Sequence, residues 1–166
     1  MYDKIQNIGP FLAVAAGICL CGCIIFLVKL FIGQYRRSRR IGIIDEMEGH
    51  DFEYFCAELL EKRGFLDVEV TRGSGDYGVD ILAEKDGVTY AIQCKRYAAP
   101  VGVEAVQQVY AGRDCYDRMV GAVMTNQYFT ASAVEAAKRL KILLWDRGYL
   151  DSMIEESEKK FGRDEL

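Results

Sequence analysis

Hydrophobic residues dominate the first part of the chain without a regular spacing. Residues Ile8 to Val28 form a run of 21 positions that carries no charge. An α-helix rises about 1.5 Å per residue, so about 20 apolar residues cross the hydrocarbon core of a bilayer. Lys29 follows at once and can extend its ammonium group to the membrane surface. The pattern predicts a transmembrane helix at residues 8–28, after a short external N-terminus at residues 1–7.

Beyond residue 45 the hydrophobic spacing becomes regular. Phe52, Cys56 and Leu59 recur at the spacing of one helical face, which predicts a helix over residues 46–63. Alternating or continuous apolar runs predict three strands, at residues 68–70, 79–84 and 89–95. Asp86-Gly87 separates the last two and is a strong signal for a two-residue hairpin turn.

The rest of the chain alternates between helices and strands. The predicted elements are a helix after Pro100, a strand at 120–125, a helix from Thr130, a strand at 142–145 and a helix from about residue 149. Thr130 is the expected N-cap of its helix, and Thr125 and Asn126 are expected to organise the turn before it. This order of elements predicts an α/β fold, with a central mixed sheet flanked by helices.

Charge divides the chain near residue 40. Residues 1–40 hold six of the 21 Lys and Arg residues and one of the 25 acids, a net charge of +5, whereas residues 41–166 carry −9. Four arginines at positions 36, 37, 39 and 40 follow the apolar run, which favours a cytoplasmic C-terminal domain and an external N-terminus. No small-residue cleavage site follows the run, so we expect a retained anchor rather than a signal peptide. The expected location is the cell inner membrane, crossed once.

These boundaries divide the chain into an anchor and one domain. Residues 29–45 form a basic juxtamembrane linker, whose charges can also contact anionic membrane lipid. Residues 46–156 form the predicted globular domain, and residues 157–166 form a charged, flexible tail. Six cysteines without a CxxC pair, and a single histidine, argue against a structural zinc site and for reduced thiols.

The hairpin turn fixes which side chains share a face of the two strands. If Asp86-Gly87 is the loop, then opposed positions follow by counting outward from it. The expected opposed pairs are Lys85–Val88, Glu84–Thr89, Leu82–Ala91, Asp80–Gln93 and Gly78–Lys95. Asp80, Gln93 and Lys95 should therefore converge on one patch, and Gly78 should leave space above Lys95.

A carboxylate, an amide oxygen and an ammonium group together suit the cleavage of a phosphodiester. Asp80 can hold Mg²⁺, with Mn²⁺ as a possible substitute, and the Gln93 amide oxygen and the Cys94 backbone carbonyl are further candidate ligands. Lys95 can stabilise developing negative charge. The alternative is an exposed strand face with an ordinary salt bridge. Asp is depleted in strand interiors, however, and the apolar neighbours Val79 and Ile92 indicate a buried sheet.

Three blocks of sequence resemble the catalytic domain of Mrr-type restriction endonucleases, a branch of the PD-(D/E)xK nuclease superfamily. The central block is GSGDYGVDILAEKDGVTYAIQCKRY at residues 73–97; the others lie at residues 50–65 and 123–137. The resemblance covers residues 45–150 and implies a restriction-endonuclease-like α-β-β-β-α-β core. It also implies that Asp80 binds metal and that Gln93-Cys94-Lys95 is the QxK variant of the superfamily signature.

The resemblance implies Mg²⁺-dependent endonucleolytic hydrolysis of double-stranded DNA, in restriction of foreign or modified DNA. The family's first-helix acid maps onto Glu53, which could restore the negative charge that Gln93 lacks at the metal site. A −9 domain is a poor general DNA-coating protein, although an enzyme can use acids to hold cations. No separate target-recognition domain is visible, so a partner or a homodimer is expected to supply specificity.

Two other classes of function stay open from the sequence. A catalytically silent DNA-binding or signalling module could keep the same fold, although the intact Asp80, Gln93 and Lys95 argue against a decayed site. A structural membrane protein, whose soluble domain binds another protein, would suit the acidic domain. It would leave the polar trio unexplained.

Overall fold

The computed structural model describes residues 8–72, 75 and 77–164, excluding the side chains of residues 8–16, 36–41 and 160–164. The chain forms two compact units, Met1–Arg40 and Ile41–Leu166. Helix α2 (Ile8–Glu46) begins in the first unit, and its last residues, 41–46, belong to the second. The predicted external segment 1–7 lies outside the described residues, as do positions 73, 74 and 76 of the glycine-rich loop.

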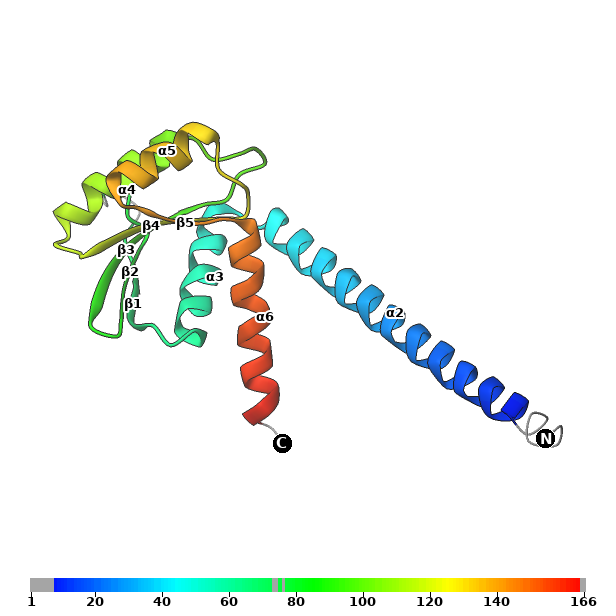
Figure 1. Ribbon diagram of the computed structural model, residues 1–166. Coiled ribbons are helices and arrows are strands. Elements are labelled where there is room, and N and C mark those ends of the chain that lie inside the picture. The colour runs from blue at the N-terminus through cyan, green and yellow to red at the C-terminus, as the bar shows by residue number, and fades with distance from the viewer. Residues whose placement is uncertain (1–7, 73–74, 76, 165–166) are drawn as a thin grey trace. The chain divides into compact units, whose positions relative to one another are not determined.

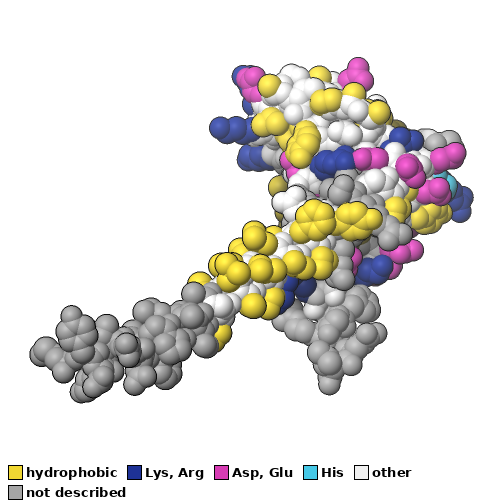
Figure 2. All heavy atoms as spheres, turned by 90° about the vertical axis from the view of Figure 1, so that its right-hand side faces the viewer, with side chains coloured by type: hydrophobic (Ala, Val, Ile, Leu, Met, Phe, Trp, Pro, Cys, Tyr) yellow, Lys and Arg dark blue, Asp and Glu magenta, His cyan; other side chains and the backbone are white. Residues whose placement is uncertain are grey.

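Within the described residues, helix α2 contains the one segment that is long and apolar enough to cross a membrane, Gly17–Tyr35. None of this segment is buried inside the protein, and Figure 2 shows its hydrophobic side chains gathered on the surface. The predicted transmembrane segment 8–28 and the predicted basic linker 29–45 lie in this one helix. The arginine side chains of the linker lie outside the described part of the chain.

The second unit is built on a five-stranded mixed sheet in the order β1-β2-β3-β4-β5. The strands are β1 (Leu66–Val70), β2 (Ile81–Lys85), β3 (Val88–Lys95), β4 (Val120–Thr125) and β5 (Leu143–Trp145). β1, β2 and β3 pair antiparallel, whereas β3 pairs parallel with β4 and β4 pairs parallel with β5. The predicted mixed sheet is confirmed, and β4 has the predicted bounds.

Four helices cover the two faces of this sheet (Figure 1). They are α3 (Gly49–Lys62), α4 (Val103–Cys115), α5 (Ala131–Leu140) and α6 (Arg147–Asp164). α3 and α6 pack on one face, where Phe52, Ile92 and Met124 are buried together. α4 and α5 pack on the other face, around Val106 and Val123. Successive residues of a strand thus face opposite layers, as a sheet buried on both sides requires.

Two helix boundaries differ from the predicted ones. α3 begins at Gly49 rather than at residue 46, because the preceding residues up to Glu46 complete the last turn of α2. α6 begins at Arg147 and runs to Asp164, so it enters the segment 157–166 that the sequence predicted as a charged tail. Leu150, Met153 and Ile154 are buried on α6, and this apolar stripe anchors the helix to the core.

The hairpin between β2 and β3 has the predicted two-residue turn. Asp86 and Gly87 both have left-handed backbone angles, with φ of 53° and 78°, which is the combination that a type I′ turn requires. Lys85 pairs with Val88, and the regular ladder continues down to the pair Ile81–Ile92. The predicted register is confirmed over this length, and it places the end of β3 beside the start of β2.

Candidate active site

Asp80 lies directly before β2, at the point where the regular ladder ends. The Asp80 N–H donates to the Ile92 carbonyl at 2.9 Å, and the Asp80 carbonyl accepts from the Thr71 N–H at 2.9 Å. The expected opposed pairs Asp80–Gln93 and Gly78–Lys95 are therefore absent from the described ladder. The reason is local: Tyr77 and Gly78 have φ of 51° and 74°, and this left-handed turn takes the chain out of the extended conformation.

The turn nevertheless brings the expected side chains to one place. Asp80, Gln93 and Lys95 line a single open pocket of about 380 Å³, together with Tyr77, Gly78 and Gln108. The Asp80 Oδ2 atom accepts a hydrogen bond of 2.6 Å from the backbone N–H of Cys94, between Gln93 and Lys95. This bond ties the carboxylate to the strand that carries the other two residues.

Gln93 is almost completely buried, and its neighbours determine how its amide is oriented. One end of the amide lies 2.8 Å from the Ala105 carbonyl, and the other end lies 2.9 Å from Lys95 Nζ. A carbonyl can only accept and an ammonium group can only donate, so the amide nitrogen must face Ala105 and the oxygen must face Lys95. Gln93 thus holds the Lys95 ammonium group at the pocket.

Gln108 of α4 is a pocket residue that the sequence did not indicate. Its side-chain amide lies 2.9 Å from that of Gln93. With the Gln93 oxygen facing Lys95, the Gln108 amide presents its nitrogen to the same oxygen. The available signal was its spacing: Ala105, Gln108 and Gly112 recur on one helical face, and only Gln108 is polar. That face packs toward the loop before β2.

Two glycines allow this close packing of α4 against the loop. A Cβ atom on Gly78 would lie 2.8 Å from Gln108 Cβ and 3.4 Å from the end of the Gln93 amide that faces Lys95 and Gln108. One on Gly112 would lie 2.4 Å from Val79 Cγ2 and 2.6 Å from the Tyr77 carbonyl oxygen. Helix α4 therefore occupies the space directly above Gly78.

Cys94 faces the opposite side of β3, toward α3. Its thiol is buried, and its pKa is raised well above the usual value. The largest cause is a hydrogen bond with Cys56, followed by burial and then by electrostatic interactions with Cys56, Asp80 and Glu53. Both cysteines belong to the hydrophobic core. Cys94 is therefore a protonated core residue, and only its backbone faces the chemistry of the pocket.

Glu53 is not among the residues that line the pocket. It lies on α3, and its Oε2 atom is 3.0 Å from His50 Nδ1 at the exposed start of that helix. Its charge is the last in order of size among the causes that raise the pKa of Cys94. The structure therefore brings Asp80, Gln93 and Lys95 together and leaves Glu53 at the periphery.

The donor set of the pocket fits a hard cation held partly by water. Among the described residues no cluster of three or more His, Cys, Asp and Glu side chains has a metal-binding arrangement. The pocket is lined by the Asp80 carboxylate and by the side-chain amides of Gln93 and Gln108. Mg²⁺ accepts such oxygen ligands and keeps several waters. A soft or tetrahedral metal has no matching thiolate or imidazole set among these described side chains.

The fold and the pocket define a restriction-endonuclease-like nuclease domain. The family Mrr_cat, described as a restriction endonuclease, matches residues 44–154, and the chain belongs to this family. No curated protein sequence matches the chain. The Mrr-type resemblance and the predicted fold class are thereby confirmed.

Solved structures share this fold at low sequence identity. The DNA modification-dependent restriction endonuclease AspBHI is 17% identical, with a TM-score of 0.56 over 74% of this chain and 35% of its own. A protein of unknown function, AF1548, is 24% identical, with a TM-score of 0.51 over 59% of each chain. The MspJI restriction endonuclease, in complex with a 27-mer oligonucleotide, is 18% identical, with a TM-score of 0.49 over 72% of this chain and 30% of its own. The present chain thus spans between 30% and 59% of these proteins.

Proposed function

We propose that this chain is a membrane-anchored, divalent-metal-dependent DNA endonuclease that restricts foreign or modified DNA. The observation that carries the proposal is the pocket in which Asp80, Gln93 and Lys95 meet, inside a domain of the Mrr_cat family. A carboxylate and an ammonium group that face one open pocket are the groups that phosphodiester hydrolysis uses to hold a cation and to balance negative charge.

Each residue of the pocket has a distinct proposed role. The Asp80 carboxylate and the Cys94 backbone carbonyl would hold Mg²⁺, or Mn²⁺ in its place, and Gln93 is the next candidate oxygen ligand. When bound, the ion polarises the phosphate and lowers the pKa of a water molecule. The Lys95 ammonium group, held by the Gln93 oxygen, faces the developing charge on the phosphate.

Glu53 is proposed to act from a greater distance. Glu53 lies on α3, which packs against β3, so its carboxylate can add negative potential to the metal site. A Glu53→Gln variant should require a higher Mg²⁺ concentration for half-maximal cleavage. Cleavage with unchanged Mg²⁺ dependence would remove Glu53 from the site while leaving the other roles in place.

The activity is tested with the full-length chain purified in a mild detergent. Supercoiled plasmid is incubated with Mg²⁺ or Mn²⁺, and nicked and linear products are separated on a gel. We expect Asp80→Ala and Lys95→Ala to abolish nicking, and EDTA to abolish it in the parent chain. Lys62→Ala is the matched control, because Lys62 is exposed on α3 and forms an ion pair with Glu58, one turn earlier on the same helix. Binding of plasmid without nicking would instead identify a catalytically silent DNA-binding or signalling module.

The membrane anchor rests on a different part of the chain. The Gly17–Tyr35 segment of α2 exposes large apolar side chains, including Ile18, Phe26 and Phe31, each more than 60% exposed. Such a surface is unfavourable in water and is satisfied by lipid. We expect the chain to stay in the membrane pellet after extraction at high pH, with the nuclease domain on the cytoplasmic side of the inner membrane. Release into the supernatant would refute the anchor without touching the nuclease.

The chain's own target recognition is expected to come from outside the domain. AspBHI, a restriction endonuclease of the same fold, is about twice as long as this chain, because the shared region is 74% of this chain and 35% of that protein. A homodimer or a separate recognition partner would supply the missing surface. Crosslinking of the chain in native membranes, followed by mass spectrometry, would identify a second copy or a partner. Crosslinks confined to single chains would exclude both.

A further inference from the structure

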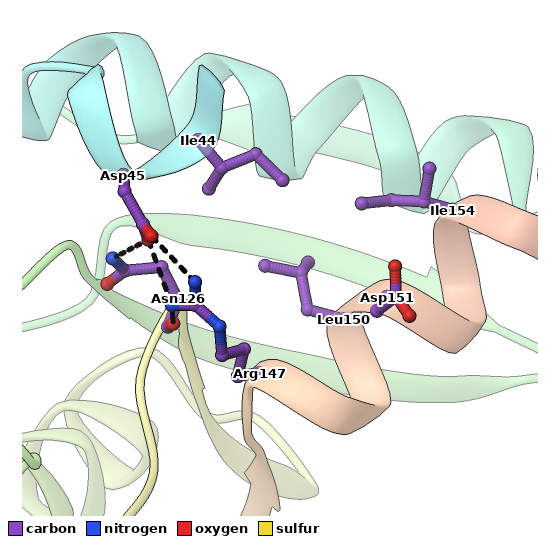
Figure 3. A pocket seen from close by; sticks show the side chains of 7 residues that line it. All are labelled: Ile44, Asp45, Asn126, Arg147, Leu150, Asp151 and Ile154. Carbon is purple, nitrogen blue, oxygen red and sulfur yellow. Dashed lines mark hydrogen bonds and ion pairs between the residues drawn. The ribbon is translucent and has the colours of Figure 1, made fainter. Parts of the chain in front are cut away.

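Asp45 lies in the last turn of α2 and forms the hub of a polar network in the second unit (Figure 3). Its carboxylate accepts two hydrogen bonds from the Arg147 guanidinium group, at 2.9 Å on Oδ1 and 2.6 Å on Oδ2. The Oδ1 atom also accepts from Asn126 Nδ2 at 2.8 Å. Such a forked Arg–carboxylate pair is directional and among the stronger polar contacts in proteins.

Asn126 connects this network to the strand that carries Lys95. Asn126 is buried, and its Oδ1 atom accepts from the Tyr97 N–H at 2.9 Å. Its Nδ2 group donates to the Tyr97 carbonyl at 3.0 Å as well as to Asp45. One amide side chain therefore holds both backbone groups of the residue two positions beyond Lys95. Every polar atom of this amide faces a partner of the opposite kind.

A second contact fixes Lys95 itself. The Thr125 hydroxyl donates to the Lys95 carbonyl at 2.6 Å, and Lys95 pairs with Thr125 in the parallel ladder of β3 and β4. Arg147 also donates to the Asn126 carbonyl at 2.6 Å, so it holds the chain that follows Thr125. Tyr97 lies between the end of β3 and the start of α4, so its backbone belongs to neither element. The Asn126 side chain holds it in place instead.

We propose that Asp45, Asn126 and Arg147 form a positioning network for the nuclease site, in which the last turn of α2 sets the position of Lys95. The inference rests on the proposed function of Lys95. It adds that the end of the helix bearing the apolar segment is a structural part of the active site. Arg147 and Asn126 hold the Asp45 pKa below its usual range, which keeps the carboxylate charged at neutral pH. Ile44 packs in the core beside Leu150 and Ile154, so this turn is also anchored by apolar contacts.

The test compares Asp45→Asn with Glu156→Gln in the full-length chain. Glu156 forms the control pair, because its carboxylate also lies 2.6 Å from a guanidinium group, that of Arg63, at the α3–α6 contact and away from Lys95. Each variant replaces one carboxylate oxygen with an amide nitrogen. We expect Asp45→Asn to lower kcat for plasmid nicking between about tenfold and about a hundredfold at unchanged KM, because misplacement of a reacting group costs rates of this order. Glu156→Gln should leave both constants unchanged.

A second measurement is independent of activity. Hydrogen exchange of the Tyr97 amide is followed by NMR after selective ¹⁵N-tyrosine labelling, with the signal assigned by its loss in Tyr97→Phe. Opening of the Asn126 bond should make this amide exchange faster in Asp45→Asn than in the parent chain and in Glu156→Gln. Asp45→Glu, which keeps the charge, should restore part of both the slow exchange and kcat.

The two measurements separate the possible failures. Unchanged exchange at Tyr97, or equal loss of kcat in Asp45→Asn and Glu156→Gln, would overturn the positioning network. A parent chain that never nicks DNA, with faster Tyr97 exchange in Asp45→Asn, would overturn the proposed function and retain the network. If Asp45→Asn does not fold, the Asp45→Glu variant decides. We expect this variant to keep only part of kcat and of the slow Tyr97 exchange, so parent values of both would overturn the network.

Discussion

Replacing Gly78 by alanine measures how tightly helix α4 closes over the pocket. Gly78 has a φ of +74°, and the added Cβ would lie 2.8 Å from Gln108 Cβ, a distance that real Cβ atoms do not show. Gly87 has almost the same φ, +78°, but a Cβ there would meet nothing within 4 Å. Gly87→Ala is therefore a matched control that carries the backbone strain without the crowding.

The expected magnitudes follow from these two geometries. An L-residue in the left-handed region costs about 1–2 kcal/mol, which is the whole expected effect of Gly87→Ala. Gly78→Ala adds the cost of overpacking, about 1–3 kcal/mol, for a total of about 2–5 kcal/mol. Because the crowded atoms belong to Gln108 and Gln93, the same change should displace the Gln93 oxygen from Lys95 and lower the nicking rate.

Trp145 makes the stability assay specific to the nuclease unit. It is the single tryptophan of the chain and is buried in the core on the α3–α6 face. Urea unfolding followed by its fluorescence gives the free energy of unfolding of this unit, and plasmid nicking gives the activity. Equal destabilisation by the two alanine variants, or full nicking activity in Gly78→Ala, would refute the close contact between α4 and the loop before β2.

Three further changes test other parts of the structure. Gln93→Glu would place a carboxylate oxygen where the amide nitrogen now lies 2.8 Å from the Ala105 carbonyl. We expect this change to lower the free energy of unfolding in urea by about 1–3 kcal/mol. Gln93→Met is the control, because it removes the polar contact altogether. The Asp45 pKa is lowered in the folded chain, chiefly by Arg147, so the ionised carboxylate stabilises the fold fully above the unfolded pKa of about 3.9 and loses this effect as pH falls through the lower folded pKa. The difference in unfolding free energy between the parent and Asp45→Asn should therefore shrink only below about pH 4. A difference that stays constant with pH would contradict this prediction. Thr130 Oγ1 accepts from the Ala133 N–H at 3.2 Å as the N-cap of α5, so Thr130→Ala should cost about 1 kcal/mol and Thr130→Ser much less, as urea unfolding would show.

The elements of the fold were predictable because each depends on local spacing. The alternation in β2 and β3, the Asp86-Gly87 turn and the Thr130 cap are all decided by residues within a few positions of one another. The end of α2 was not predictable in this way. Residues 41–46 continue a helix and also pack into the domain, and the burial of Ile44 depends on α6, about a hundred residues later.

The difference between local and long-range contacts also explains which site residues the sequence indicated. Asp80, Gln93 and Lys95 lie on two strands joined by a short hairpin, so counting from the turn brought them to one patch. Counting failed only at Asp80 and Gly78, where left-handed residues interrupt the ladder. Asp45 and Arg147 are 102 positions apart, and no local pattern pairs them. The contact of Gln108 with Gln93 likewise depends on how α4 packs over the sheet.

The neighbours of position 93 explain why this residue is an amide. A glutamate there could accept from Lys95 but could not donate to the Ala105 carbonyl, whereas glutamine does both. A glutamate would also pair its charge with the Lys95 ammonium group inside a buried site, and so reduce the positive charge that the proposed mechanism directs at a phosphate. The amide leaves that charge undiminished and fixes its position through Ala105 and Gln108. With Gln93 neutral, Asp80 is the acid among the described residues that line the pocket, and its bond to the Cys94 N–H gives it a fixed place beside Lys95.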